Sequence, residues 1–195
     1  MENVGQRSYE TWGEPGSPTD VGDFSLNGYE RNVLFWNQGG SKFVDIGYGA
    51  HCDRLEDGRG LVTADFDRDG QLDVLVQNFE RPAVLLMGSG AVGHWLQVRL
   101  QGAQSARDAA GAFVTVEADG RAQHRQVALG SGYLSSPSTV LHYGLGIATE
   151  VTRLTIDWPS GRRQVLENLP VNQRLLIREG SQQPEPRIVP ASDRR

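Results

Sequence analysis

The residues best suited to chemistry are four aspartates in the segment 65–73, which reads DFDRDGQLD and fits the pattern DxDxDGxxD. Five oxygen donors can converge there on one cation: the carboxylates of Asp65, Asp67, Asp69 and Asp73 and the backbone carbonyl of Gln71. Hard oxygen donors at this density favour Ca²⁺ over Zn²⁺ or copper. We therefore expect a Ca²⁺ site, with Gly70 at its sharp turn because a residue without Cβ reaches positive φ at little cost.

The segments on either side of these aspartates indicate what kind of calcium loop this is. LVTA precedes the loop and DVLVQ follows it, and such β-branched, apolar runs are typical of strands. An EF-hand would instead have flanking helices and a bidentate Glu at its twelfth position, which here is Val76. The alternative is a solvated acidic turn without metal, but carboxylates this close repel one another unless a cation neutralises them. The sequence therefore predicts a β-hairpin calcium loop, in which the ion chiefly stabilises the hairpin.

The elements that must position this loop have an all-β pattern. The chain contains 24 glycines, helix-period patterns are almost absent, and short alternating apolar runs recur roughly every ten residues. A first group of strands is predicted at Val33–Trp36, Phe43–Asp45, Leu61–Ala64, Asp73–Gln77 and Ala83–Met87. A second group is predicted at Trp95–Leu100, Ala112–Glu117, Gln123–Ala128, Thr139–Tyr143, Arg153–Asp157, Arg163–Glu167 and Arg174–Arg178. Seven strands over about 85 residues have the size of a β-sandwich.

This pattern divides the 195 residues into four parts. They are an irregular N-terminal extension (1–28), a calcium-loop β unit (29–90), a seven-stranded β-sandwich (94–180) and a Pro-rich tail (181–195). The boundary between the two β parts is placed at the flexible junction MGSGAVG. Tails of such composition are by default free. The alternative is a tail that wraps a neighbouring subunit, which Trp12, Phe24 and Tyr29 support for the N-terminal extension.

Two stretches of the chain resemble known families. DGRGLVTADFDRDGQLDVLVQNF is similar to the FG-GAP or VCBS repeat, the blade-like β unit of integrin-type propellers, and NVLFWNQGGSKFVDIG resembles the strand pair before it. HWLQVRLQGAQSARDAAGAFVTV, GSGYLSS, LHYGLG and IDWPSGRRQVLENLPVNQRLLI then resemble, in order, the ASPIC/UnbV domain of the cartilage acidic protein-like family. The resemblance covers about residues 28–180 and implies Ca²⁺ at the aspartate positions given above.

The resemblance also sets an expectation for the fold. A closed propeller takes at least four blades, and this chain has material for one or two. We therefore expect an all-β protein in which a partial propeller-type unit precedes the sandwich, with exposed sheet edges that a tail or a partner must cover.

Other candidate sites are weaker. Ser131, His142 and Asp157 would make a nucleophilic set, but GSGYL is not the GxSxG elbow and no helix follows it. The four histidines lack paired ligand spacing, and a cation wrapped by carboxylates has little open coordination for a water nucleophile. We therefore expect no catalytic residue and no enzyme. Trp95, Tyr133 and Trp158 would suit a carbohydrate-stacking platform, although core packing better explains the two tryptophans, which lie in apolar strands.

Composition excludes several classes of function. A net charge of −5 argues against nucleic-acid binding, and no apolar run is long enough to cross a bilayer. The N-terminal residues have no secretory signal pattern, and Cys52, as the single cysteine, forms neither an intrachain disulfide nor a cysteine zinc site. The chain contains 18 arginines but only one lysine, Lys42. This excess of arginine reflects either a biased composition or an anion-binding surface.

These observations lead to one main hypothesis about function. The chain is expected to be a non-enzymatic, calcium-stabilised β module for protein–protein association, as an accessory subunit or fragment of a larger extracytoplasmic protein or complex. Its partners would dock through the N- and C-terminal extensions. The alternative is a carbohydrate-binding, lectin-like module. An extracellular, periplasmic or cell-surface location is expected, because roughly millimolar calcium there saturates even weak sites.

Overall fold

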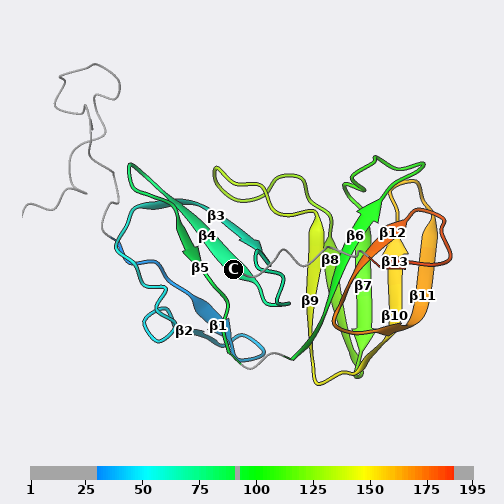
Figure 1. The fold of residues 1–195 in the computed structure, drawn as a ribbon, viewed down its shortest axis with the longest axis horizontal. Coiled ribbons are helices and arrows are strands. Elements are labelled where there is room, and N and C mark those ends of the chain that lie inside the picture. Colours follow the sequence, from blue (N-terminus) through cyan, green and yellow to red (C-terminus); the bar gives the residue numbers. More distant parts are fainter. Residues whose placement is uncertain (1–29, 91–92, 187–195) are drawn as a thin grey trace, which may run out of the picture. The chain divides into compact units, whose positions relative to one another are not determined.

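The computed structural model describes residues 30–90 and 93–186, and within these residues the chain is all β, as predicted (Figure 1). Strands, turns and bends alternate, and no helix occurs in this part of the chain, so none is long and apolar enough to span a membrane. The expected N-terminal extension (1–28), with Trp12 and Phe24, lies outside the described residues. So do Tyr29 and the last nine residues of the tail.

Five short strands lie in the first half of the chain. They are β1 (Phe35–Asn37), β2 (Phe43–Asp45), β3 (Gly58–Ala64), β4 (Asp73–Asn78) and β5 (Val84–Leu86). β1 and β2 form an antiparallel two-stranded sheet, and a second sheet has the order β3-β4-β5. Between β1 and β2 the chain reverses through Gly39 and Gly40, both of which have positive φ.

The second half of the chain forms two four-stranded sheets. Their strands are β6 (His94–Gln101), β7 (Phe113–Ala118), β8 (Arg121–Gln126), β9 (Val140–Gly146), β10 (Glu150–Asp157), β11 (Arg163–Pro170), β12 (Gln173–Arg178) and β13 (Glu185–Pro186). One sheet has the order β11-β10-β7-β8 and the other β13-β12-β6-β9. Every pair in these sheets is antiparallel except β12 with β6, which is parallel. Each predicted strand overlaps one of those observed, with ends shifted by up to three residues.

The strand β13 adds a feature that the sequence pattern did not predict. Two residues of the Pro-rich tail pair with β12, in the register Leu175↔Pro186 and Leu176↔Glu185. The Arg178 side chain reinforces this pairing through a 2.8 Å bond from its Nε to Glu185. A short edge strand that contains proline protects a sheet against further strand addition. Two residues are too few to give an alternating pattern, which is why the sequence did not reveal this strand.

The hydrophobic core lies between the two four-stranded sheets and draws on both. Side chains from alternate positions of the strands are almost fully buried, among them Leu96, Val98, Val114, Val116, Tyr143, Leu154, Ile156 and Ile177. Burying one such side chain stabilises the fold by about 1.5–3 kcal/mol. Trp158 belongs to this core, with 3% exposure, and its indole Nε1 donates to Gln164 over 3.0 Å. Core packing is therefore the correct explanation for Trp158.

The chain folds into two compact units. In the described part of the chain, the first contains residues 30–61 together with Leu75–Leu86, and the second contains Val62–Val74 together with residues 87–90 and 93–186. The aspartate loop therefore belongs to the same unit as the sandwich. Among the described residues of the first unit, Val76 is the one buried hydrophobic side chain, so these residues form hardly any core of their own.

Candidate metal centre

The aspartate loop connects β3 to β4, and the pairing of these strands brings its two ends together. Asp65 follows the last residue of β3, and Asp73 is the first residue of β4. Asp65, Asp67 and Asp73 each offer a carboxylate oxygen, and these oxygens lie within 4.8 Å of one another. Three of the four predicted carboxylates thus converge as a cation would require.

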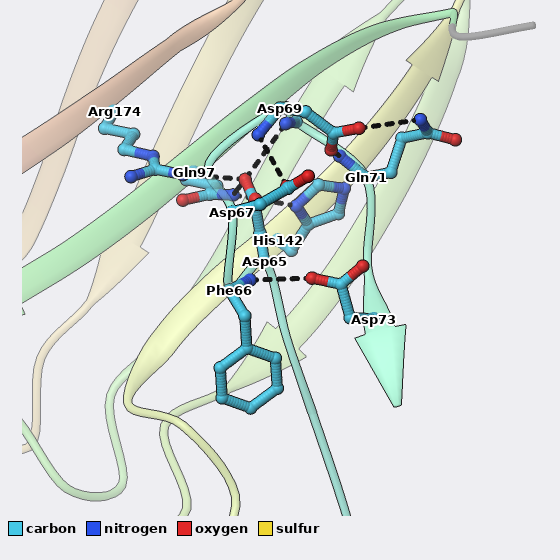
Figure 2. Close-up of polar contacts among 10 residues, drawn as sticks. Asp65, Phe66, Asp67, Asp69, Gln71, Asp73, Gln97, His142 and Arg174 are labelled. Carbon is cyan, nitrogen blue, oxygen red and sulfur yellow. Dashed lines mark hydrogen bonds and ion pairs between the residues drawn. The ribbon is translucent and has the colours of Figure 1, made fainter. Parts of the chain in front are cut away.

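Asp69 is placed differently from the other three. Its two oxygens accept hydrogen bonds from the backbone N–H and the side-chain amide of Gln71, at 2.8 and 2.9 Å (Figure 2). The structure therefore leaves Asp69 outside the converging carboxylates and gives the Gln71 side chain a role in holding it.

Backbone N–H groups of the loop, together with that of Gly88 after β5, donate to the carboxylates and hold the loop in shape. Asp65 Oδ2 accepts from Gly70 at 3.1 Å, and Asp67 Oδ1 accepts from Asp69 at 3.1 Å. Asp73 accepts from Phe66 at 2.7 Å through Oδ2 and from Gly88 at 2.8 Å through Oδ1. These bonds fix the carboxylates before any ion binds.

Gly70 is required at the turn for two separate reasons. Its φ of 94° lies in the left-handed region that favours glycine, as the sequence predicted. A Cβ at this position would also lie 2.0 Å from Nε1 of Trp95, so the backbone approaches the indole too closely for any side chain. Trp95, which is half-buried, thus packs against the loop, whereas the sequence had predicted that it packs within the hydrophobic core.

The loop is bonded to the outer face of the sheet that contains β6, β9 and β12. Besides Gly70, Asp65 Oδ2 accepts from Gln97 Nε2 and from Arg174 Nη2, both at 2.7 Å (Figure 2). Gln97 is paired in register with His142 on β9 on one side and with Arg174 on β12 on the other. Three neighbouring strands therefore present one row of polar side chains to the loop.

Sequence reasoning did not find Gln97, His142 or Arg174 as parts of this centre. Their alternation with apolar residues predicts that they face outward, but it gives no sign that the three strands are neighbours. The parallel pairing of β6 with β12 creates the row, and it joins segments far apart in the sequence.

The hydrogen bonding of the two Asp65 oxygens indicates whether the centre fits a cation. Its Oδ2 accepts three hydrogen bonds, whereas its Oδ1 is buried and has no hydrogen-bond partner. A buried polar atom left unpaired costs about 1–3 kcal/mol. Together with the nearby oxygens of Asp67 and Asp73, this orphan oxygen fits a hard divalent cation such as Ca²⁺.

His142 is adjacent to the centre but is unsuited to be a charged member of it. Burial lowers the pKa of His142 and outweighs the opposite effect of Asp65, and the positive charges of Arg125 and Arg174 lower it further. Its ring stacks on Trp95 at 6.3 Å, and its Nδ1 lies 3.3 Å from the Gln97 amide nitrogen. We assign His142 the role of packing and positioning Gln97.

A single buried carboxylate, that of Glu179, stabilises the sandwich itself. Oε2 of Glu179 accepts the backbone N–H groups of Ala103, Gln104 and Ser105 at 2.7–2.8 Å, and Oε1 accepts the hydroxyls of Ser105 and Ser160. Burial alone would raise the pKa of Glu179, but these hydrogen bonds to its charged form lower it to about 2. Glu179 thus anchors the loop after β6 to the hairpin between β10 and β11.

The residues considered for catalysis and for sugar stacking have other partners. Asp157 accepts a 2.6 Å bond from Arg163, and His142 is engaged with Gln97 and Trp95. Tyr133 is 69% exposed, whereas Trp158 is buried in the core. The three aromatic residues therefore do not form one exposed platform.

Comparison with known proteins agrees with the resemblance found in the sequence. Residues 102–184 match the ASPIC and UnbV family, and residues 20–76 match the FG-GAP-like repeat. Cartilage acidic protein 1 of Xenopus tropicalis is 28% identical over 158 residues, which cover 72% of this chain and 24% of the relative. Cartilage acidic protein 1 of Mus musculus is 35% identical over 111 residues, which cover 54% of this chain and 17% of the relative. The chain thus carries an FG-GAP-like repeat followed by an ASPIC and UnbV domain, and its matched parts span about a quarter or less of these relatives.

Proposed function

We propose that the FG-GAP-like repeat and the ASPIC and UnbV domain of this chain form a non-enzymatic module that binds Ca²⁺ for stability and associates with another protein through its first unit. The observation that carries the proposal is the scarcity of buried hydrophobic side chains among the described residues of the first unit. Its described residues bury one hydrophobic side chain, while Phe35, Trp36 and Phe43 on the β1–β2 hairpin are 62%, 55% and 58% exposed.

An isolated two-stranded hairpin with such side chains is marginally stable in water. Phe35 and Phe43 lie on one face of this hairpin and Trp36 on the other, because successive side chains of a strand alternate. Exposed aromatic groups mark an association surface, and each would contribute about 1.5–3 kcal/mol if a partner buried it. The partner that fits is another apolar β surface. A neighbouring blade-like repeat has this chemistry, which accords with the FG-GAP-like match of residues 20–76.

Calcium has a structural role in this proposal. Asp65, Asp67 and Asp73 would hold the ion. The sequence pattern adds Asp69 and the Gln71 carbonyl, and Asp69 would have to give up its hydrogen bonds with Gln71 to join the ion. The ion would neutralise carboxylates that otherwise repel one another and would join the two ends of the β3–β4 loop. Because Asp65 is also bonded to Gln97 and Arg174, fixing this residue fixes the loop on the sandwich.

A structural calcium site of this kind is useful where calcium is abundant. We therefore place the module outside the cytoplasm, at a cell surface, in a periplasm or in an extracellular matrix. Its similarity to proteins named for cartilage favours this location.

The calcium part of the proposal is tested by titrating the purified, chelator-treated chain with Ca²⁺ in a calorimeter. We expect one saturable site for Ca²⁺ in the wild type and none in Asp65→Asn. An absence of heat up to millimolar Ca²⁺ would contradict the calcium role.

The association part is tested by affinity capture from extracts of the source cells, followed by mass spectrometry. We expect a specific protein to be retained by the wild type and lost with Trp36→Ser or Phe43→Ser. Tyr133→Ser, an equally exposed aromatic change in the other unit, is the control and should leave capture unchanged. Identical capture by all variants would refute the hairpin as the docking surface.

A further inference from the structure

A pocket of about 480 Å³ opens beside the aspartate loop, on the outer face of the sheet that contains β6, β9 and β12. It lies entirely within the second unit, and β8, the end of β3 and the loop that contains Ser131 and Ser138 complete its wall. This volume falls within the range of about 300–1,000 Å³ that is usual for small-molecule sites. The metal centre shares Asp65, Gln97 and Arg174 with its wall, but none of the functions described above uses the rest of the pocket.

The charge of the pocket opposes the charge of the whole chain. Four arginines line it, Arg68, Arg99, Arg125 and Arg174, in a protein whose net charge is −5. Among the described residues of the lining, Asp65 is the one carboxylate, and it already forms a 2.7 Å ion pair with Arg174. The described lining therefore holds more arginines than carboxylates.

Arg99 and Arg125 are the two arginines best placed to meet a ligand. Arg99 is half-buried on β6, and its register neighbours, Val140 and Leu176, are apolar. The guanidinium of Arg125, on β8, lies over the Tyr143 ring, 5.7 Å from its centre. No ion pair of either arginine is found within residues 30–90 and 93–186. Two guanidinium groups without carboxylate partners are suited to a planar or tetrahedral oxyanion.

The rest of the lining is rich in uncharged polar groups. Thr63, Ser131 and Ser138 supply hydroxyls, and Gln126 and His124 supply an amide and an imidazole. Ser138 also accepts the Val140 N–H at 3.1 Å, which fixes its hydroxyl at the rim. Such groups match a ligand that carries several hydroxyls, and the volume exceeds that of a bare sulfate ion.

We propose that this pocket binds a small acidic saccharide, whose sulfate or carboxylate group is held by Arg99 and Arg125 and whose hydroxyls meet the Ser, Thr and Gln side chains. This binding differs from a lectin-type stacking platform, because guanidinium groups and hydroxyls carry the recognition instead of exposed tryptophans. It goes beyond the association and calcium roles proposed above, since neither arginine belongs to the loop or to the β1–β2 hairpin.

The test is calorimetry on the full chain in Ca²⁺ at constant ionic strength, with four probes. Glucose 6-sulfate and glucuronate carry the two candidate anions, glucose lacks the charge, and inorganic sulfate lacks the sugar. We expect at least one acidic sugar to bind at least tenfold more tightly than glucose and inorganic sulfate. The tighter of the two acidic sugars identifies the anionic group.

Matched variants connect the binding to the pocket. Arg99→Gln and Arg125→Gln should each weaken binding of the acidic sugar about tenfold or more, because each removes a charged, forked donor. Arg121→Gln removes an exposed arginine from the same strand as Arg125, but outside the pocket, and should leave binding unchanged. All three variants should keep the response of the melting temperature to calcium, which separates a failure of this proposal from a failure of the calcium role.

Three results would overturn the proposal. One is no binding of either acidic sugar, and another is glucose or inorganic sulfate binding as tightly as the acidic sugars. The third is wild-type affinity in both Arg99→Gln and Arg125→Gln.

Discussion

Arg174 donates a hydrogen bond from Nη2 to Oδ2 of Asp65 over 2.7 Å, and the two side chains keep only 15% and 2% of their surface exposed. The residues are 109 positions apart in the sequence. This buried ion pair joins the aspartate loop to the sandwich.

Removing the cationic partner of this pair should destabilise the second unit strongly. Arg174→Met leaves the Asp65 carboxylate buried with fewer partners, and losing one member of a buried ion pair costs about 3–5 kcal/mol. Urea unfolding in the presence of EDTA should show this loss in the free energy of unfolding. Arg153→Met is the control: its pair with Glu167 is about half exposed on both sides, and such pairs contribute about 0–1 kcal/mol. Equal losses of unfolding free energy in the two variants would show that the Arg174–Asp65 pair stabilises the protein no more than an exposed pair does.

Removal of calcium should lower the melting temperature of the wild type. An ion that binds only the folded loop stabilises the folded state by mass action, and EDTA removes this stabilisation because it removes the ion. Asp67→Ala deletes one of the converging carboxylates and should abolish the difference between melting in Ca²⁺ and in EDTA. Asp157→Ala, which removes an exposed carboxylate paired with Arg163, should retain the difference. Wild-type melting curves that coincide with and without chelator would rule out a structural calcium site.

Glu179 should make stability depend on pH in the acid range. Its pKa in the folded state is about 2, below the ordinary value of 4.5, so its contribution is fully present above pH 4.5 and is lost as pH falls from 4.5 towards 2. Glu179→Gln should lower the free energy of unfolding at pH 7 by about 2 kcal/mol, because the hydrogen bonds to a charged acceptor are lost. The gap between wild type and variant should narrow as pH falls through this window.

Urea unfolding at a series of pH values measures that gap. Glu167→Gln changes an exposed carboxylate and should alter stability at pH 7 by no more than about 0.5 kcal/mol. A gap between wild type and Glu179→Gln that stays constant from pH 7 to pH 2 would contradict the assignment.

Gly70→Ala should disrupt the contact between the loop and Trp95. The new Cβ meets the indole at 2.0 Å, and the φ of 94° is unfavourable for alanine, so we expect a loss of about 3 kcal/mol and a change in tryptophan fluorescence. Gly161→Ala separates the two causes. Its φ is 86°, but nothing lies within 4 Å of the added Cβ, so about 1 kcal/mol of backbone strain is expected. Similar losses in both variants would mean that the steric contact with Trp95 is unimportant.

Local patterns in the sequence were sufficient to predict the strands and the loop. Alternating apolar residues gave every strand except β13, and the spaced aspartates with Gly70 identified the turn, whose positive φ the structure confirms. These features depend on near neighbours in the chain, so a single sequence reveals them.

Features that depend on strand pairing could not be predicted from local sequence patterns. Gln97 and Arg174 meet Asp65 because β6 and β12 are neighbours in one sheet, and no local pattern specifies that pairing. Glu179 is similar, because its role depends on three backbone N–H groups about 75 residues earlier. The arginine-lined pocket also arises from strands that the sequence alone does not place together.

The parallel pairing of β12 with β6 has a consequence for the order of folding. β6 lies between β9 and β12 in its sheet, so its second edge stays open until the chain has been made as far as Arg178. Contacts this distant in sequence form slowly, because a long loop must close before they contribute. The aspartate loop emerges from the ribosome more than 100 residues before Arg174, and docking on the sandwich must therefore wait until β12 has been synthesised.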